Sequence, residues 1–159
     1  MSYGFNIAEN CHVVNVIPAT LGSAATLTGD YINMEHAAHC DFIVSFGSSA
    51  ATSTIEVQEA CTAAGATATT LASVYYKEVT AKGDTMDDYA VTTASGVITD
   101  GILVPITNNI LYVISVDANQ MAETKKWLTV TIKEAGVNEV CCVAVLSGLR
   151  YAPTVTAIT

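Results

Sequence analysis

The sequence predicts an all-β protein, a sandwich or barrel of about eight to ten short strands. Apolar and polar residues alternate with a period of two in segment after segment. Clusters of Gly, Ser, Thr, Asn and Asp separate these segments, and the helical spacing of apolar residues is nearly absent. The chain has 159 residues, which is the length of one domain with one hydrophobic core. We therefore expect a single sandwich domain over residues 1–159.

The clearest alternation lies in residues 40–46. Three alternate residues of this segment are expected in the core: Phe42, Val44 and Phe46. Residues 52–61 alternate in the same way, with a bulge expected to turn Cys61 toward the apolar side. We expect the two segments to form a half-buried hairpin joined by residues 47–51.

Two later segments have different patterns. Residues 127–134 alternate cleanly, with Leu128, Val130 and Ile132 expected inside and Thr129, Thr131 and Lys133 outside. Residues 110–117 are apolar on both faces, which predicts a central strand covered on both sides. The remaining predicted strands are 13–17, 31–34, 72–79, 89–93, 102–106 and 140–146.

Few segments favour anything other than strands. Residues 121–126 are compatible with one helical turn, which Asp117 or Asn119 could cap. Residues 60–72 are rich in Ala and Thr and predict an extended surface loop. Residues 1–10 and 152–159 have no clear period, so we expect an N-terminal and a C-terminal arm.

The composition limits the classes of partner. Hydrophobic residues make up 51% of the chain and charged residues 13%, so much of the surface is expected to be buried against other proteins. The net charge of -9 disfavours nucleic acid and anionic membrane surfaces, because both require a basic face. No apolar run is long enough to span a membrane, and the first 20 residues do not resemble a secretory leader. Five cysteines without CxxC spacing indicate free thiols and synthesis in a reducing cytoplasm.

One cluster has residue types that bind metals. His36, His39 and Cys40 lie close together in the sequence, but a zinc site needs a fourth ligand and converging side chains. We favour a loop that leads into the 40–46 strand and predict no metal or other cofactor. The acidic group Asp84, Asp87 and Asp88 lacks the glycine and glutamate spacing of a calcium loop, so we interpret it as a solvated turn.

No catalytic set is recognisable in the sequence. Cys11 and His12 are neighbours on a predicted strand and should point to opposite faces, which disfavours a nucleophile and base pair. Glu56 and Glu59 should also face opposite sides, unlike the paired carboxylates of a glycosidase. Phosphate-binding and nucleophile-elbow motifs are absent. We therefore expect a protein that is not an enzyme.

Four stretches stand out in order along most of the chain: residues 10–15, residues 75–78 with 82–85, residues 109–114 with 116–118, and residues 145–151. Together they resemble small structural proteins of tailed bacteriophages, and more narrowly their capsid cement or decoration proteins. The resemblance implies a jelly-roll sandwich that assembles as a homotrimer. It also implies binding to the outside of the virion head, where each copy bridges neighbouring subunits of the major capsid protein and stabilises the DNA-filled shell.

Two other classes of function remain open at this point. A tail or baseplate protein would share the β-architecture and differ in its partner, and a carbohydrate-binding sandwich on the virion would need exposed aromatic residues. Trp127 is the sole tryptophan and begins a strand, where a core or rim position is favoured. For a capsid contact we expect aromatic and apolar anchors in the arms. These are Tyr3, Phe5, Tyr151, Pro153 and Ile158.

Overall fold

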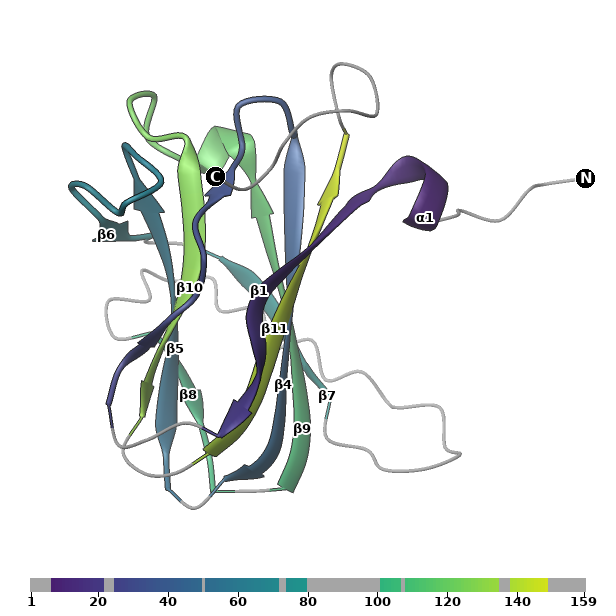
Figure 1. Cartoon of the computed structure of the whole chain (residues 1–159), viewed down its shortest axis with the longest axis vertical. Coiled ribbons are helices and arrows are strands. Elements are labelled where there is room, and N and C mark those ends of the chain that lie inside the picture. Colours follow the sequence, from purple (N-terminus) through teal and green to yellow (C-terminus); the bar gives the residue numbers. More distant parts are fainter. Residues whose placement is uncertain are drawn as a thin grey trace, which may run out of the picture.

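The fold is all-β, as predicted: two antiparallel sheets pack face to face in a computed structural model (Figure 1). The structure describes residues 7–21, 25–49, 51–71, 74–79, 101–106, 108–134 and 138–148. Within these ranges the helices are α1 (Ile7–Asn10) and the 3-10 turn η1 (Ala118–Gln120). Neither these nor any other helix in the described ranges could cross a membrane.

The five-stranded sheet has the order β1-β11-β4-β9-β7. Its strands are β1 (His12–Leu21), β11 (Asn138–Ser147), β4 (His39–Ser49), β9 (Asn108–Asp117) and β7 (Tyr75–Val79). The six-stranded sheet follows the path β2-β10-β5-β6, with β3 also paired to β10 and β8 to β5. Its strands are β2 (Leu27–Thr28), β3 (Ile32–Asn33), β10 (Trp127–Glu134), β5 (Ser53–Ala60), β6 (Thr69–Thr70) and β8 (Ile102–Val104).

The strand pairs are nested in the chain. The first strand, β1, pairs with the last, β11, and β2 and β3 pair with the penultimate strand, β10. Further inside the chain, β4 pairs with β9 and β5 with β8. Successive pairs lie alternately in the five-stranded and the six-stranded sheet. The chain is thus arranged like one long folded hairpin wound around a common core.

Aromatic and branched side chains from both sheets fill the space between them. Phe42, Val44 and Phe46 are fully buried, as their alternation predicts. The ring of Phe46 meets Tyr112 edge to face, with centroids 6.3 Å apart. Leu128 and Ile132 contribute from the opposite sheet and are also fully buried. Burial of each such side chain stabilises the fold by about 1.5 to 3 kcal/mol.

The predicted hairpin between residues 40–46 and 52–61 is wrong. The strands β4 and β5 lie in different sheets, where they pair with β11 and β9 and with β10 and β8 respectively. A short connection joins strands across the sandwich as easily as within one sheet, so connection length did not decide the partner. The predicted bulge at Cys61 is also absent, because β5 pairs in regular register to Ala60 and Cys61 is exposed.

Two predictions about strand faces need correction. Strand β9 is buried on one face, with Ile110 and Tyr112 in the core, whereas Leu111 and Val113 on the other face are half-exposed. The hydroxyl residues Thr129 and Thr131 were expected outside and are buried. The Thr129 hydroxyl donates to the carbonyl of Gly29 (2.8 Å), which satisfies its polarity away from water.

The other predicted segments fall close to their expected places. Strands occur at or near residues 13–17, 31–34, 72–79, 102–106 and 140–146. The predicted helical turn lies instead at Ala118–Gln120, immediately after Asp117. Of the expected surface loop 60–72, residues 61–68 form a loop that is exposed except for two half-buried positions. The prediction is wrong at both ends, because Ala60 is buried in β5 and Thr69–Thr70 form β6. Of the expected N-terminal arm, residues 7–10 form α1. The predicted strand 89–93, the acidic turn at Asp84, Asp87 and Asp88, and the arm 152–159 lie outside the described residues.

Candidate functional site

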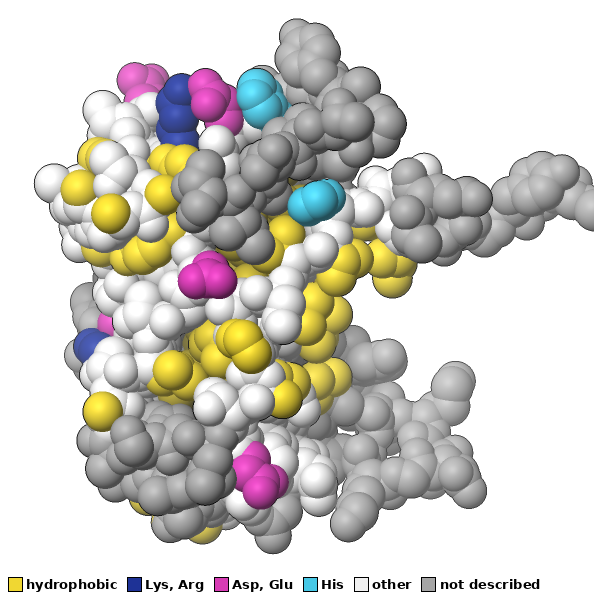
Figure 2. All heavy atoms as spheres, viewed as in Figure 1, with side chains coloured by type: hydrophobic (Ala, Val, Ile, Leu, Met, Phe, Trp, Pro, Cys, Tyr) yellow, Lys and Arg dark blue, Asp and Glu magenta, His cyan; other side chains and the backbone are white. Residues whose placement is uncertain are grey.

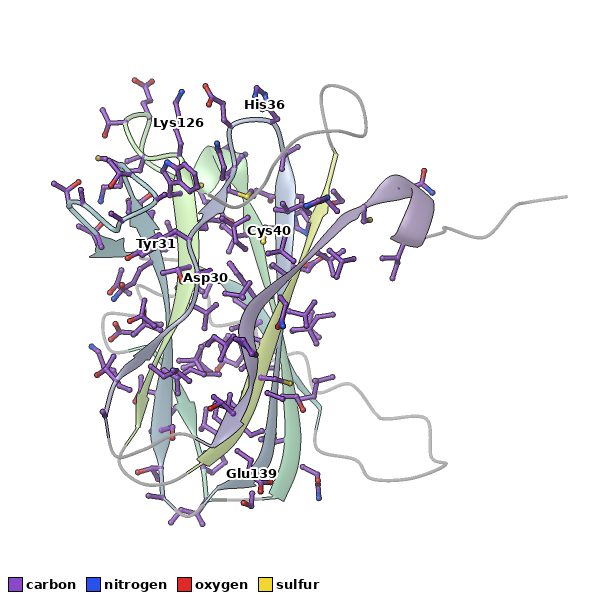
Figure 3. The ribbon with its side chains drawn as sticks, viewed as in Figure 1. Asp30, Tyr31, His36, Cys40, Lys126 and Glu139 are labelled. Atoms are coloured by element: carbon purple, nitrogen blue, oxygen red, sulfur yellow. The ribbon has the colours of Figure 1, made fainter. Side chains whose placement is uncertain are left out.

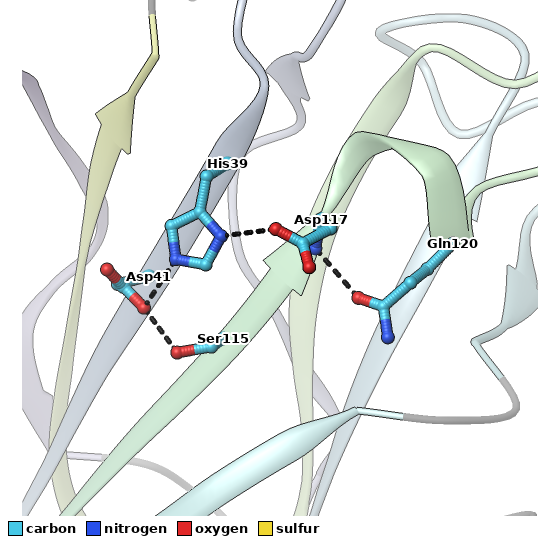
Figure 4. A network of polar contacts seen from close by, with 5 residues as sticks. All are labelled: His39, Asp41, Ser115, Asp117 and Gln120. Carbon is cyan, nitrogen blue, oxygen red and sulfur yellow. Dashed lines mark hydrogen bonds and ion pairs between the residues drawn. The ribbon is translucent and has the colours of Figure 1, made fainter.

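A polar cluster lies at one end of the outer face of the five-stranded sheet, the face turned away from the six-stranded sheet (Figure 4). The cross-strand register places His39 opposite Asp117 and Asp41 opposite Ser115. His39 Nδ1 is 2.7 Å from Asp117 Oδ1, and its Nε2 is 3.1 Å from Asp41 Oδ1. The Ser115 hydroxyl donates to the same Asp41 oxygen. One imidazole therefore joins two carboxylates on adjacent strands.

The electrostatics of the cluster favour a charged imidazole. Partial burial lowers the pKa of His39, but hydrogen bonds and charge from Asp117 and Asp41 outweigh it, so the pKa is raised. The doubly protonated ring donates to both carboxylates, which a neutral ring with one N–H cannot do. Ser115 donates to Asp41 and not to the imidazole. The cluster is thus suited to bridging β4 and β9, and it does not place Ser115 against a base.

Beyond the cluster, the same outer face is aliphatic. Val145, Ile43 and Val113 project from β11, β4 and β9, and each is half-exposed. The register places Val143 opposite Ile43 and Ile43 opposite Val113, so their side chains form a row across three strands. Val13 on β1 lies opposite Val145 and is 51% exposed. The face of a sheet that contacts water normally carries polar side chains, so this row is a candidate contact surface.

Two hollows lie along this face. The first has a volume of about 400 Å³ and is lined by Ile7, Cys11, Asp41, Ile43, Val113, Val145 and Ser147. The second has a volume of about 420 Å³ and is lined by Ala19, Thr20, Ser45, Gly47, Glu139, Val140 and Cys141. Ile43 and Ser45, two residues apart on β4, line one hollow each. We call the two hollows and the aliphatic row between them the trough.

The short helix α1 bounds the trough at the end near His39. It projects from the side of the molecule formed by the five-stranded sheet (Figure 1), and hydrophobic side chains gather beneath it (Figure 2). Ile7 of α1 lines the first hollow and is 50% exposed. At the opposite end, Glu139 lies against Gly47, where an added Cβ would approach its Oε2 to 2.6 Å. A glycine at position 47 thus leaves room for the Glu139 carboxylate.

The outer face of the six-stranded sheet differs, because its polar groups are paired with one another. Glu56 is 4% exposed and forms an ion pair with Lys133. The Glu56 carboxylate also accepts hydrogen bonds from Gln58 and Thr70, both at 3.4 Å. Such satisfied polar groups favour a structural role within the sheet rather than contact with a partner.

The residues considered for a metal site do not converge. Cys40 points into the core between the sheets, while His36 lies at the end of the sandwich (Figure 3). His39 projects from the outer face with its ring nitrogens on Asp41 and Asp117. Burial and the nearby Asp41 charge raise the pKa of the Cys40 thiol far above its ordinary value, which disfavours a thiolate ligand. Among the described residues, no three His, Cys, Asp or Glu side chains are grouped to hold a metal ion.

The other residues considered in the sequence have different positions. The expected interface residues Tyr3, Phe5, Tyr151, Pro153 and Ile158 lie outside the described residues. Glu56 and Glu59 bind different lysines, Lys133 and Lys125. The burial of Glu56 and Glu59 was not predicted from the sequence.

Sequence reasoning missed both the polar cluster and the trough. His39 and Asp117 are 78 residues apart, so their contact depends on which strands pair. One sequence signal could have indicated the trough: residues 110–117 are apolar on both faces, and their second apolar face forms part of the trough. The half-buried Trp127 is compatible with the expected rim position.

Neither a family model, nor a curated protein, nor a solved structure matches this chain.

Proposed function

We propose that this chain is a structural, non-enzymatic assembly protein, and specifically a cement protein that binds the outer surface of a tailed-phage capsid. The observation that carries the proposal is the trough, an aliphatic outer face on a sandwich whose described core residues lie between the two sheets. A half-exposed aliphatic row on the outer face of a sheet favours contact with another protein. The resemblance of the four sequence stretches to capsid cement proteins supplies the specific partner, the major capsid protein.

The strand arrangement supports the proposal. We infer that the sandwich is a jelly roll, because nested pairs wound alternately into two sheets are the arrangement expected of that fold. Jelly rolls occur in viral capsid proteins, but also in lectins and cupins, so the fold alone does not carry the function.

Contact through the sheet face is favoured over pairing at the edge strand β1. The register between β1 and β11 shifts twice, and the exposed Pro18 has no N–H to donate. Both features hinder a further strand from pairing with this edge. A partner would therefore lie against the trough rather than extend the sheet.

In this proposal each copy strengthens the shell by bridging. Contacts to two or more capsid subunits act together, since release requires all of them to open at once. Assembly as a homotrimer would multiply the contacts further. The proposed location is the exterior of the virion head, after synthesis in the host cytoplasm.

The test is co-sedimentation of the purified chain with empty heads and with tails of the phage that encodes it. We expect binding to heads and none to tails, and release of packaged DNA at a higher temperature when the chain is bound. Binding to tails alone would replace the capsid proposal with a tail function. Binding to neither particle would overturn both.

A further inference from the structure

The trough is acidic at both ends, and between them it carries the aliphatic row together with Ser45 and Cys141. Asp41 and Asp117 lie at one end and Glu139 at the other, and the two aspartates hold His39 between them. The register also places Lys77 of β7 opposite Val113, between the two ends, whereas Lys133 lies on β10, and Lys125 and Lys126 lie in the turn before it. A basic partner group near either end would meet carboxylates: two that share one imidazole at the first end, and Glu139 at the second.

The spacing of the two ends follows from the strand geometry. Asp41 and Gly47 are six residues apart on β4, and Glu139 lies against Gly47. Six residues of a strand span about 20 Å. The aliphatic row of Val143, Ile43 and Val113 crosses the strands between these ends.

We infer that the trough binds a segment of another protein that carries aliphatic side chains flanked by two basic side chains about 20 Å apart. This inference rests on the proposed function and names the chemistry of the capsid surface that would be recognised. In an extended segment the facing residues would follow the order basic, aliphatic, aliphatic, basic at alternate positions. The aliphatic side chains would cover the row, and the basic groups would pair with Asp117 and Glu139.

Other occupants fit the charges less well. A second copy packed face to face by a two-fold axis across the strands would bring Glu139 of one copy toward the Asp41 and Asp117 end of the other, and an axis along the strands would bring each acidic end against its own copy. Like charges would then meet at both ends of the interface. An anionic lipid surface would be repelled by the same carboxylates.

The experiment is a titration of the isotope-labelled full chain with two synthetic peptides, followed by NMR. The first peptide is Lys-Thr-Val-Thr-Val-Thr-Lys, and the matched control replaces both lysines with glutamate. We expect the lysine peptide to shift amide signals of β4, β9 and β11, with affinity at least tenfold higher than that of the control. Raising the salt concentration to 0.5 M should reduce the difference. Equal affinities, no binding by either peptide, self-association through this face, or shifts confined to the six-stranded sheet would overturn the inference.

Variants separate this inference from the proposed function. Val113→Thr keeps the β-branched shape but removes a trough methyl group, and Leu103→Thr is its control on the six-stranded sheet, where Leu103 is 67% exposed. Glu139→Lys is paired with Glu123→Lys in the exposed turn before β10. We expect Val113→Thr and Glu139→Lys to weaken peptide binding at least fivefold, and the two controls to leave it unchanged.

The same variants are then sedimented with heads. Head binding that survives both trough variants would overturn the inference and leave the cement proposal standing. Peptide binding without head binding by the unmodified chain would overturn the cement proposal and leave the trough as a binding site.

Discussion

His39 and Asp117 face each other across β4 and β9, with His39 Nδ1 2.7 Å from Asp117 Oδ1. On its other side the ring is 3.1 Å from Asp41 Oδ1. Removing the imidazole proton would leave one of these carboxylates against a ring nitrogen lone pair. The link between the two strands should therefore depend on pH.

The first prediction concerns this pH dependence. The folded pKa of His39 is raised above the ordinary value of 6.5, so the folded state holds its proton more tightly than the unfolded state. The resulting stability is fully present below the unfolded pKa and is lost as the pH rises through the folded pKa. We expect this contribution to be about 0.5 to 1 kcal/mol, because the cluster is partly exposed.

The measurement is urea unfolding over pH 5.5 to 9 for the unmodified chain, His39→Gln and Asp117→Asn. His39→Gln should remove the part of the stability loss that occurs as the pH rises above about 6.5. Asp117→Asn should reduce it, because Asp41 still interacts with the ring. A His39→Gln variant with the full original slope would show that another group is responsible.

The second prediction concerns the thiols. Burial raises the pKa of Cys40 and Cys142 far above the ordinary thiol value, whereas Cys61 is exposed. The thiolate is the reactive species, so Cys61 should be alkylated by iodoacetamide at pH 8 long before the two buried thiols. Mass spectrometry of digested samples would give the order, and unfolding in urea should remove it. Rapid labelling of Cys40 in the native protein would contradict the core packing described above.

The third prediction concerns the buried carboxylate of Glu56. Lys133→Met removes its cation, and we expect a loss of about 1 to 2 kcal/mol, since the lysine is half-exposed while the carboxylate is buried. Glu56→Gln in the same chain should restore part of this loss, because a neutral amide is less costly to bury than an unpaired charge. A double-mutant cycle by urea unfolding measures the coupling. Additive losses would show that the ion pair contributes nothing to the fold.

The fourth prediction contrasts two glycines. Gly101 has a φ of +77°, and an added Cβ would lie 2.7 Å from the carbonyl oxygen of Ile55. Gly101→Ala should destabilise the fold by about 2 to 4 kcal/mol, from backbone strain together with overpacking. At Gly47 the nearest atom is the end of the Glu139 side chain, which can move. Thermal unfolding should therefore show a loss below about 1 kcal/mol for Gly47→Ala, and similar losses for both variants would contradict this account.

Local alternation predicted much of the fold because it reflects which side of each strand is buried. Phe42, Val44 and Phe46 were assigned to the core from residues 40–46 alone, and all three are fully buried. The same reasoning failed at Thr129 and Thr131, whose hydroxyl groups are polar but find acceptors beside β2. Whether a threonine can be buried depends on a neighbour supplied by another part of the chain.

The candidate site could be predicted less well from local alternation. Residues 110–117 have two apolar faces, and the sequence does not state whether a second layer covers the outer one. In the described structure Val113 lies half-exposed in the trough. The expected anchors, Tyr3, Phe5, Tyr151, Pro153 and Ile158, fall outside the described residues and stay a prediction.

A period of two within each segment was enough to predict the all-β class, the approximate strands and most of the inward-facing residues. Tertiary structure alone decided that β4 and β5 lie in different sheets, that His39 reaches Asp117, and that an aliphatic row with acidic ends lies on one outer face. Strand pairing joins residues far apart in the chain through backbone groups that every residue carries. Which strands pair therefore depends on how all the strands pack together. The side-chain contacts that follow from this pairing are not encoded in any one segment.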